Sequence, residues 1–208
     1  TTVLWVVLIV VGQATAPPVT TLEDKIAAIG DPDFLYYLNY VNAAVITLLA
    51  VGALAALYRT CRVDAPFWAT IGLVFLPIYG MGNLVAYLSQ VFVVPRLLAL
   101  YRTQETMVVA RVLLGLTIQD WQPSAIAALN GVAYAVLGIP SVIFGVIVAR
   151  SRRGLRMGGL LLALSGVLSF VAVVGLAIGN AGLAAMTLVS GFVYLVATGI
   201  LAVGLLRG

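Results

Sequence analysis

The stretch Ala125–Ala149, with the sequence AIAALNGVAYAVLGIPSVIFGVIVA, contains no charged residue and is long enough to cross a lipid bilayer as a helix. A helical span needs roughly 20 predominantly apolar residues. Four more charge-free stretches of this kind occur, at Leu35–Leu57, Pro66–Val94, Met157–Ile178 and Ala184–Leu206. The sequence therefore predicts an all-α protein that crosses a membrane several times.

The overall composition agrees with this prediction. Of the 208 residues, 63% are hydrophobic and only 9% are charged, whereas a soluble domain is about one-half apolar and one-quarter charged. A soluble domain of this size lacks the charge to cover so much apolar surface. The composition excludes an ordinary soluble enzyme, a disordered chain and a nucleic-acid-binding module, and it makes membrane lipids the expected surroundings.

The segment Val3–Ala16 is apolar but would be only about 21 Å long as a helix. Because the chain begins with Thr1, we expect a turn or two of this first span to be missing. A signal peptide ending at Ala14-Thr15-Ala16 is the alternative, but Pro17 directly after that site disfavours cleavage. We expect one domain, a six-helix bundle with spans at about 3–16, 35–57, 66–94, 125–149, 157–178 and 184–206.

The basic residues predict the orientation of this bundle. With a cytoplasmic N-terminus, the inner loops would hold Arg59, Arg62, Arg150, Arg152, Arg153, Arg156 and Arg207, and the outer loops Lys25, Arg96, Arg102 and Arg111. This excess inside satisfies the positive-inside rule and places both termini in the cytoplasm. All charge is expected in loops. We interpret the run Arg150–Arg156 as a topology anchor that contacts anionic headgroups, in preference to a basic binding site.

Two outer segments are predicted to be more than connectors. Thr20-Thr21-Leu22-Glu23 has the pattern of a capping box, so a short surface helix is expected over about Leu22–Ile29, ending at Gly30. The segment Arg96–Gln122 mixes apolar runs with charges, which favours an interfacial or re-entrant helix between spans three and four.

Proline and small residues predict how the spans bend and pack. Pro77 and Pro140 are expected to kink or break the third and fourth spans, because proline removes a backbone hydrogen bond. Small residues four apart let helices approach closely. Such pairs occur at Gly52/Ala56, Gly131/Ala135, Gly145/Ala149, Gly159/Ala163 and Gly175/Gly179, which predicts a compact bundle without specifying which helices pair.

The chain has no histidine and one cysteine, Cys61. This excludes histidine-ligated metal, haem or pigment sites and catalytic sets that need an imidazole. Cys61 lies where palmitoylation is an alternative, but we interpret it as an unmodified small residue. Asp64 is expected in a surface ion pair or helix cap. No span contains a charge that would mark an ion path. We therefore expect no metal, no cofactor and no enzymatic activity.

Amides and phenols gather at one depth of the predicted bundle. Asn83 and Tyr87 repeat the spacing of Asn130 and Tyr134, four residues apart, which puts each pair on one helix face. The predicted ligand-binding residues are Asn42, Asn83, Tyr87, Gln90, Asn130 and Tyr134, with Asn39, Thr187 and Ser190 at the same depth. Two interpretations stay open: interhelical hydrogen bonding, or a polar-capped pocket open to the outside. The pocket would contact at least three of the six.

Two motif-bearing stretches resemble a group of small bacterial six-helix membrane proteins that carry a domain of unknown function. The first runs from GLVFLPIYG at Gly72 through NLVAYLSQ at Asn83 to VPRLL at Val94, and the second is NGVAYAVLGIPS at Asn130. The resemblance covers about residues 35–205. It implies an integral protein of the bacterial plasma membrane and no particular activity.

Three functions follow as hypotheses. The first is a non-enzymatic membrane protein that binds a lipid-like or other hydrophobic small molecule, or serves as a subunit of a larger membrane complex or a homo-oligomer. The second is a small-molecule transporter or its substrate-binding component, in which the outward polar residues and proline-bent spans would act. The least supported is an intramembrane enzyme with Tyr87 or Tyr134 as a lone acid.

Overall fold

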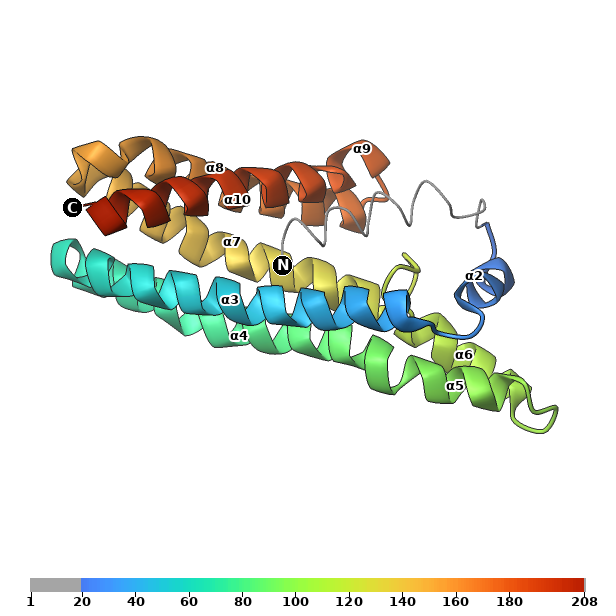
Figure 1. Ribbon diagram of the computed structural model, residues 1–208. Helices are drawn as coiled ribbons and strands as arrows, with labels where there is room; N and C mark the ends of the chain where they lie inside the picture. Colours follow the sequence, from blue (N-terminus) through green and yellow to red (C-terminus); the bar gives the residue numbers. More distant parts are fainter. Residues whose placement is uncertain (1–19, 208) are drawn as a thin grey trace. The chain divides into compact units, whose positions relative to one another are not determined.

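The computed structural model describes residues 20–207, and every regular element in that part of the chain is a helix (Figure 1). The elements are α2 (Leu22–Ile29), α3 (Phe34–Asp64), α4 (Pro66–Phe92), α5 (Val94–Tyr101), α6 (Met107–Thr117), α7 (Ala125–Ser151), the 3-10 helix η1 (Arg153–Leu155), α8 (Arg156–Ala177), α9 (Ala181–Ala184) and α10 (Met186–Arg207). Five helical segments are long and apolar enough to cross a membrane, at the five charge-free stretches. The all-α class is confirmed, and the predicted span 3–16 lies outside the described residues.

The long helices extend beyond the predicted spans. α3 continues to Asp64 and only Ala65 separates it from α4, so Arg59 and Arg62 lie on a helix. The expectation that all charge lies in loops is therefore wrong. The extra turns form because arginine is a good helix former and its long side chain can reach the membrane surface from the end of a span. Asp64 pairs with Arg152, Oδ2 to Nε 3.5 Å, as a surface ion pair.

The prolines of the long helices differ in whether a helix is interrupted near them. α4 and α7 run without interruption through Pro77 and Pro140, so the expected break is absent from both. The interruption occurs instead at Val93, between α4 and α5, where Pro95 lies in the first turn of α5. Proline is tolerated there because the first helical turn has amides without intrahelical acceptors. Helical bonds flank this point, with Val93 N donating to Ser89 O at 2.9 Å.

The segment 96–122 is a helical hairpin and not one interfacial helix. Its first residues belong to α5, which prolongs the third span to Tyr101, and α6 follows after a turn. One face of α6 exposes Val108, Val109 and Val112, while Ala110 and Leu114 are buried on the other. α6 is thus apolar on its buried face and on most of its exposed face, and with 11 residues it is too short to cross a bilayer.

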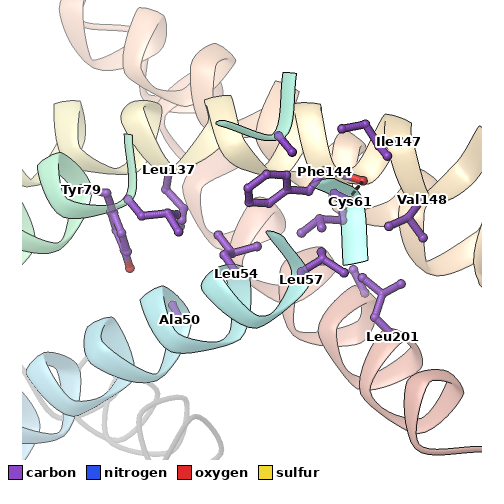
Figure 2. Packing of buried hydrophobic residues seen from close by; sticks show 14 of the residues in the cluster. Ala50, Leu54, Leu57, Cys61, Tyr79, Leu137, Phe144, Ile147, Val148 and Leu201 are labelled. Atoms are coloured by element: carbon purple, nitrogen blue, oxygen red, sulfur yellow. Dashed lines mark hydrogen bonds between the residues drawn. The ribbon is translucent and has the colours of Figure 1, made fainter. Parts of the chain in front are cut away.

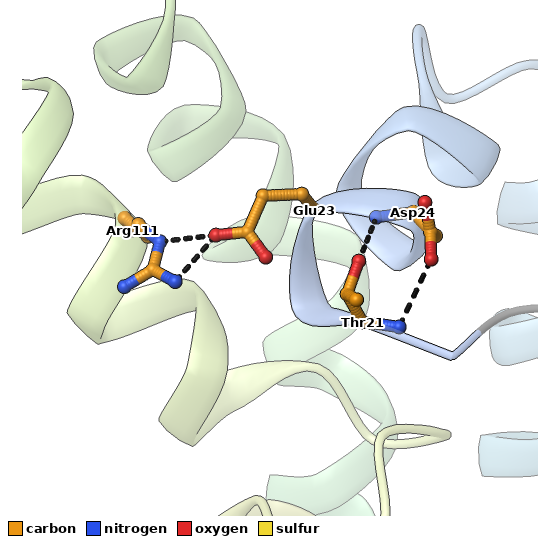
Figure 3. Close-up of polar contacts among 4 residues, drawn as sticks. All are labelled: Thr21, Glu23, Asp24 and Arg111. Carbon is orange, nitrogen blue, oxygen red and sulfur yellow. Dashed lines mark hydrogen bonds and ion pairs between the residues drawn. The ribbon is translucent and has the colours of Figure 1, made fainter.

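α2 occupies the predicted residues, but its capping box is one residue further along. Thr21 is the N-cap, its hydroxyl accepts from Asp24 N at 3.1 Å, and the Asp24 carboxylate accepts from Thr21 N at 3.0 Å. The box therefore uses Asp24 where the sequence pattern pointed to Glu23. Glu23 is left to form an ion pair with Arg111 of α6 (Figure 3). Gly30 ends the helix with φ +54°, a value that glycine adopts easily.

α2 should remain packed on the buried cluster that it shares with α5 and α6 down to acidic pH. Bonds from backbone N–H and from Arg111 lower the pKa of Glu23 below its ordinary 4.5, and bonds from Thr21 and Thr20 lower the pKa of Asp24 below 3.8. A lowered pKa stabilises the folded form above the ordinary value, and this stabilisation is lost as pH falls through the folded-state value. In a W5F/W68F background, Trp121 emission should stay constant at neutral pH and shift only below about pH 4.

Trp121 is a suitable reporter because it packs on the same buried cluster as α2. The control is Asp24→Ala, which removes the carboxylate half of the capping box and should loosen α2 already at neutral pH. A Trp121 transition centred above pH 5 in the parent protein would contradict the prediction.

The described residues form two compact units. Unit 1 holds residues 20–48 and 82–130, and its largest buried cluster consists of Ile26, Val94, Leu97, Leu98, Leu114 and Ile118. Three ion pairs fasten the 20–33 segment to the hairpin; they are Glu23–Arg111, Lys25–Asp120 and Asp31–Arg102. Each exposed pair contributes little by itself. Their shared effect is to place both segments at one end of unit 1.

Unit 2 holds residues 49–81 and 131–207 and has its own core, in which Leu54, Leu76, Phe144 and Leu162 are almost fully buried. Figure 2 shows part of this core, with Leu54 and Phe144 among its labelled side chains. Phe144 covers Gly72, where a Cβ would lie 2.7 Å from its ring. Cys61 is fully buried, with its sulfur 3.9 Å from the Phe144 carbonyl oxygen. A buried thiol supports the interpretation of Cys61 as a packing residue.

Glycine allows a close pairing of α7 and α8 in unit 2. A Cβ on Gly145 of α7 would lie 2.5 Å from Gly159 O of α8, and a Cβ on Gly166 would lie 2.5 Å from Gly138 O. Two of the small-residue pairs in the sequence, Gly145/Ala149 and Gly159/Ala163, therefore face each other. Backbones this close can form only where side chains are absent.

A second pairing in unit 2 relies on hydroxyls. Ser190 of α10 donates to Ser165 O of α8 at 2.8 Å, and its Oγ lies 2.8 Å from Ser169 Oγ. All three serines are buried. Ser190, one of the polar residues at the common depth, thus acts in interhelical bonding.

Candidate functional site

Five of the six predicted ligand-binding residues lie in unit 1. Asn42 is on α3, Asn83, Tyr87 and Gln90 are on α4, and Asn130 is on α7. The sixth, Tyr134, belongs to unit 2, where its ring centroid lies 6.3 Å from that of Tyr79. Unit 1 therefore gathers the amides.

Gln90 is fully buried, and its amide is used by the protein itself. Its Nε2 donates to the carbonyl oxygen of Thr117 at 2.8 Å, and its Oε1 accepts from the backbone N–H of Gln119 at 3.1 Å. These bonds join α4 to the end of α6. Nε2 also lies within bonding distance of Ser89 Oγ and Ala86 O. An amide with this set of partners has a structural role, because its donors and its acceptor are occupied.

Asn83 is the opposite case, although it lies on the same helix. Its side chain is 0% exposed, and neither Nδ2 nor Oδ1 has a hydrogen-bond partner in the protein. Each buried polar group left unpaired costs about 1–3 kcal/mol. Most buried side-chain polar groups in proteins are paired, so Asn83 is an exception among the described residues and is energetically unfavourable as it stands.

Two further amide oxygens of unit 1 share this property. The Oδ1 atoms of Asn39 and Asn130 are buried and have no partner in the protein. Asn39 belongs to the polar pattern in the sequence but was not among the predicted ligand-binding residues. Its spacing of three residues from Asn42 put both on one side of α3, and this was the signal that pointed to Asn39.

Asn42 and Tyr87 are buried on facing parts of α3 and α4. Tyr87 packs in a small cluster with Tyr40, Ala43 and Ala44. The Tyr36 hydroxyl, one further turn along α3, donates to Gln90 O at 3.2 Å. These contacts fix α3 against the end of α4 that carries Asn83.

An open groove occurs at a different place in the described chain. It has a volume of about 510 Å³ and is lined by Leu155 of η1 and by Ile200 and Val203 of α10, with Gly154, Gly199 and Gly204. All of these residues belong to unit 2. The pocket predicted around the amides of unit 1 stays a prediction.

Comparisons of the chain with protein-family models, with curated protein sequences and with solved structures found no match. Function is therefore argued from the buried amides themselves.

Proposed function

We propose that this chain is a non-enzymatic, multi-pass membrane protein that binds a lipid-like molecule through the unpaired amides of unit 1. The observation that carries the proposal is Asn83, which is fully buried with both polar atoms unpaired. The unpaired amide of Asn83 lowers the free energy of unfolding of the free chain, and a ligand that bonds to this amide would offset the loss.

The helix register supports a site that combines Asn83 with Asn130. α4 and α7 are antiparallel, since Gly72 meets Phe144 and, further along, Tyr79 meets Tyr134. Asn83 is one helical turn beyond Tyr79, and Asn130 is one turn before Tyr134, so both lie on the facing sides of the two helices at one level. This register would bring both amides to the same level of unit 1, which supports a shared site.

The chemistry of the unpaired atoms favours a hydroxyl group on the ligand. Asn83 offers a donor and an acceptor, and Asn130 offers an acceptor. A hydroxyl both donates and accepts, so one such group satisfies Asn83 Nδ2 and one of the amide oxygens. The surrounding residues of unit 1 are largely apolar, which fits a hydrocarbon body attached to that hydroxyl.

We further propose six spans, with both termini in the cytoplasm, in the plasma membrane of a bacterium. The ion pairs support the grouping of the loops on two sides, because Asp64–Arg152 joins two predicted inner segments and Lys25–Asp120 joins two predicted outer segments. The excess of arginine in the first group supports its cytoplasmic location. The site would then open toward the outer leaflet.

The proposal predicts that Asn83→Leu abolishes binding while it stabilises the protein. Leucine has the same branched skeleton as asparagine, so the change removes the unpaired atoms and adds about 1–3 kcal/mol to the free energy of unfolding. The delipidated chain in mild detergent is incubated with a diacylglycerol or with its acetylated form. Native mass spectrometry should show the diacylglycerol bound to the parent chain and the acetylated form unbound.

Unfolding cannot explain a variant that is more stable and no longer binds. Asn130→Leu should weaken binding in the same way. If Asn83→Leu binds diacylglycerol as well as the parent, or if both lipids bind equally, the proposed site is wrong.

A further inference from the structure

The open groove of unit 2 has an apolar lining at the end of a membrane span. Its walls are Leu155, Ile200 and Val203, and they lie on the last turns of α10 and on η1, just before α8 begins. Val203 is 50% exposed and Ile200 is 36% exposed. These side chains therefore present a hydrocarbon surface at the level where a span ends and lipid headgroups begin.

Glycine keeps the groove open. A Cβ built on Gly199 or Gly154 would meet no atom within 4 Å, whereas one on Gly204 would lie 2.1 Å from Leu155 Cδ2. Leu155 thus closes the groove against Gly204, and the space above Gly199 is free. A volume of about 510 Å³ falls in the range of small-molecule sites.

Positive charge borders the groove on η1 and its neighbours. Arg153 is the first residue of η1, and Arg156 follows Leu155 directly. Arg150, Arg153 and Arg156 are exposed and form no ion pair with any carboxylate in residues 20–207, while Arg152 is paired with Asp64. An anion beside the groove would face several arginines whose charge no carboxylate compensates.

We infer that this groove holds one acyl chain of an anionic phospholipid, with its phosphate at Arg153 and Arg156. The apolar walls recognise the chain, and the guanidinium groups recognise the phosphate, with which arginine forms paired hydrogen bonds. This goes beyond a general attraction of basic residues to headgroups, because it requires a defined place for the chain. It uses unit 2 alone and does not depend on the amide site of unit 1.

The test distinguishes the contribution of the apolar groove to lipid retention from the contribution of the arginine charge. The full chain, purified in mild nonionic detergent, is mixed with equal amounts of phosphatidylglycerol and phosphatidylcholine with identical acyl chains. Native mass spectrometry should show phosphatidylglycerol retained in preference, and added inorganic phosphate at the same concentration should not displace it. Gly199→Leu fills the groove, keeps every charge and should reduce retention about tenfold.

Gly191→Leu is the matched control. Gly191 lies on the same helix, and a Cβ there also meets nothing within 4 Å, so retention should be unchanged. If Gly199→Leu and Gly191→Leu retain phosphatidylglycerol equally, or if phosphatidylcholine is retained as well, the inference is wrong.

If Gly199→Leu does not fold, a second pair of variants tests the inference through the arginines. Arg153→Gln with Arg156→Gln should weaken retention about 30-fold, whereas Arg153→Lys with Arg156→Lys should weaken it less, because lysine keeps the charge but loses the paired hydrogen bonds. Equal retention by the glutamine and lysine variants would also overturn the inference.

Discussion

Gly145→Val is expected to lower the free energy of unfolding by about 3 kcal/mol or more. A Cβ on Gly145 would lie 2.5 Å from Gly159 O and 2.6 Å from Ala163 N, and both of these are backbone atoms. A flexible side chain could move aside, but the backbone of a helix cannot, so α7 and α8 would have to separate along their contact. The measurement is unfolding of the purified chain in mixed micelles, followed by circular dichroism.

The control substitutions place the same kind of change in open space. Gly52→Ala and Gly191→Ala meet nothing within 4 Å, and alanine favours helix over glycine by up to about 1 kcal/mol. These variants should therefore be neutral or slightly stabilised, while Gly145→Ala should be destabilised. Equal stability of Gly145→Ala and Gly52→Ala would show that the close contact of α7 and α8 is not as described.

Gln90→Met is expected to destabilise the protein by about 2 kcal/mol, because it leaves two partly buried backbone groups without partners. Those groups are the Thr117 carbonyl and the Gln119 N–H, which Gln90 bonds at 2.8 and 3.1 Å. Methionine is similar in length to glutamine, so lost hydrogen bonds and not lost volume would dominate. Amide hydrogen exchange at Gln119 should increase more than exchange in α8, since the Gln119 N–H loses its acceptor.

The contrast with Asn83 makes this prediction specific. Both residues are fully buried amides on α4, yet replacement of Asn83 by an apolar residue should stabilise the chain. If Gln90→Met were neutral, or if both substitutions changed stability in the same direction, the distinction between a structural and an unpaired amide would fail.

The spans could be predicted because charge-free runs of this length have few alternatives to a membrane helix. The helix α2 could be predicted equally well, because Thr21 and Gly30 are local sequence signals for the start and the end of a helix. The exact ends of α3 and α7 could not be predicted, because the apolar runs are followed by charged residues, which mark the end of a span but do not end a helix. Arg59, Arg62 and Arg150 are good helix formers and lie within these helices. α9 is a single turn at Ala181–Ala184 and has no sequence periodicity by which to recognise it.

The polar pattern located the amides but could not separate their roles. Whether Gln90 is satisfied depends on backbone groups near Thr117, which the hairpin of α5 and α6 brings to it. Likewise the pairing of Glu23 with Arg111 joins residues far apart in the sequence, so the local pattern assigned Glu23 to the cap. Long-range contacts decide such cases, and a single sequence contains no direct signal for them.

The single residue Ala65 between α3 and α4 leaves the adjoining ends of these helices no room to lie at opposite faces of a membrane. One residue spans at most about 3.6 Å, whereas the hydrocarbon core of a bilayer is about 30 Å thick. In a bilayer, the end of α3 and the start of α4 would therefore lie at the same face. Arg59 and Arg62 belong to that end of α3, so their charge would mark one face for both helices.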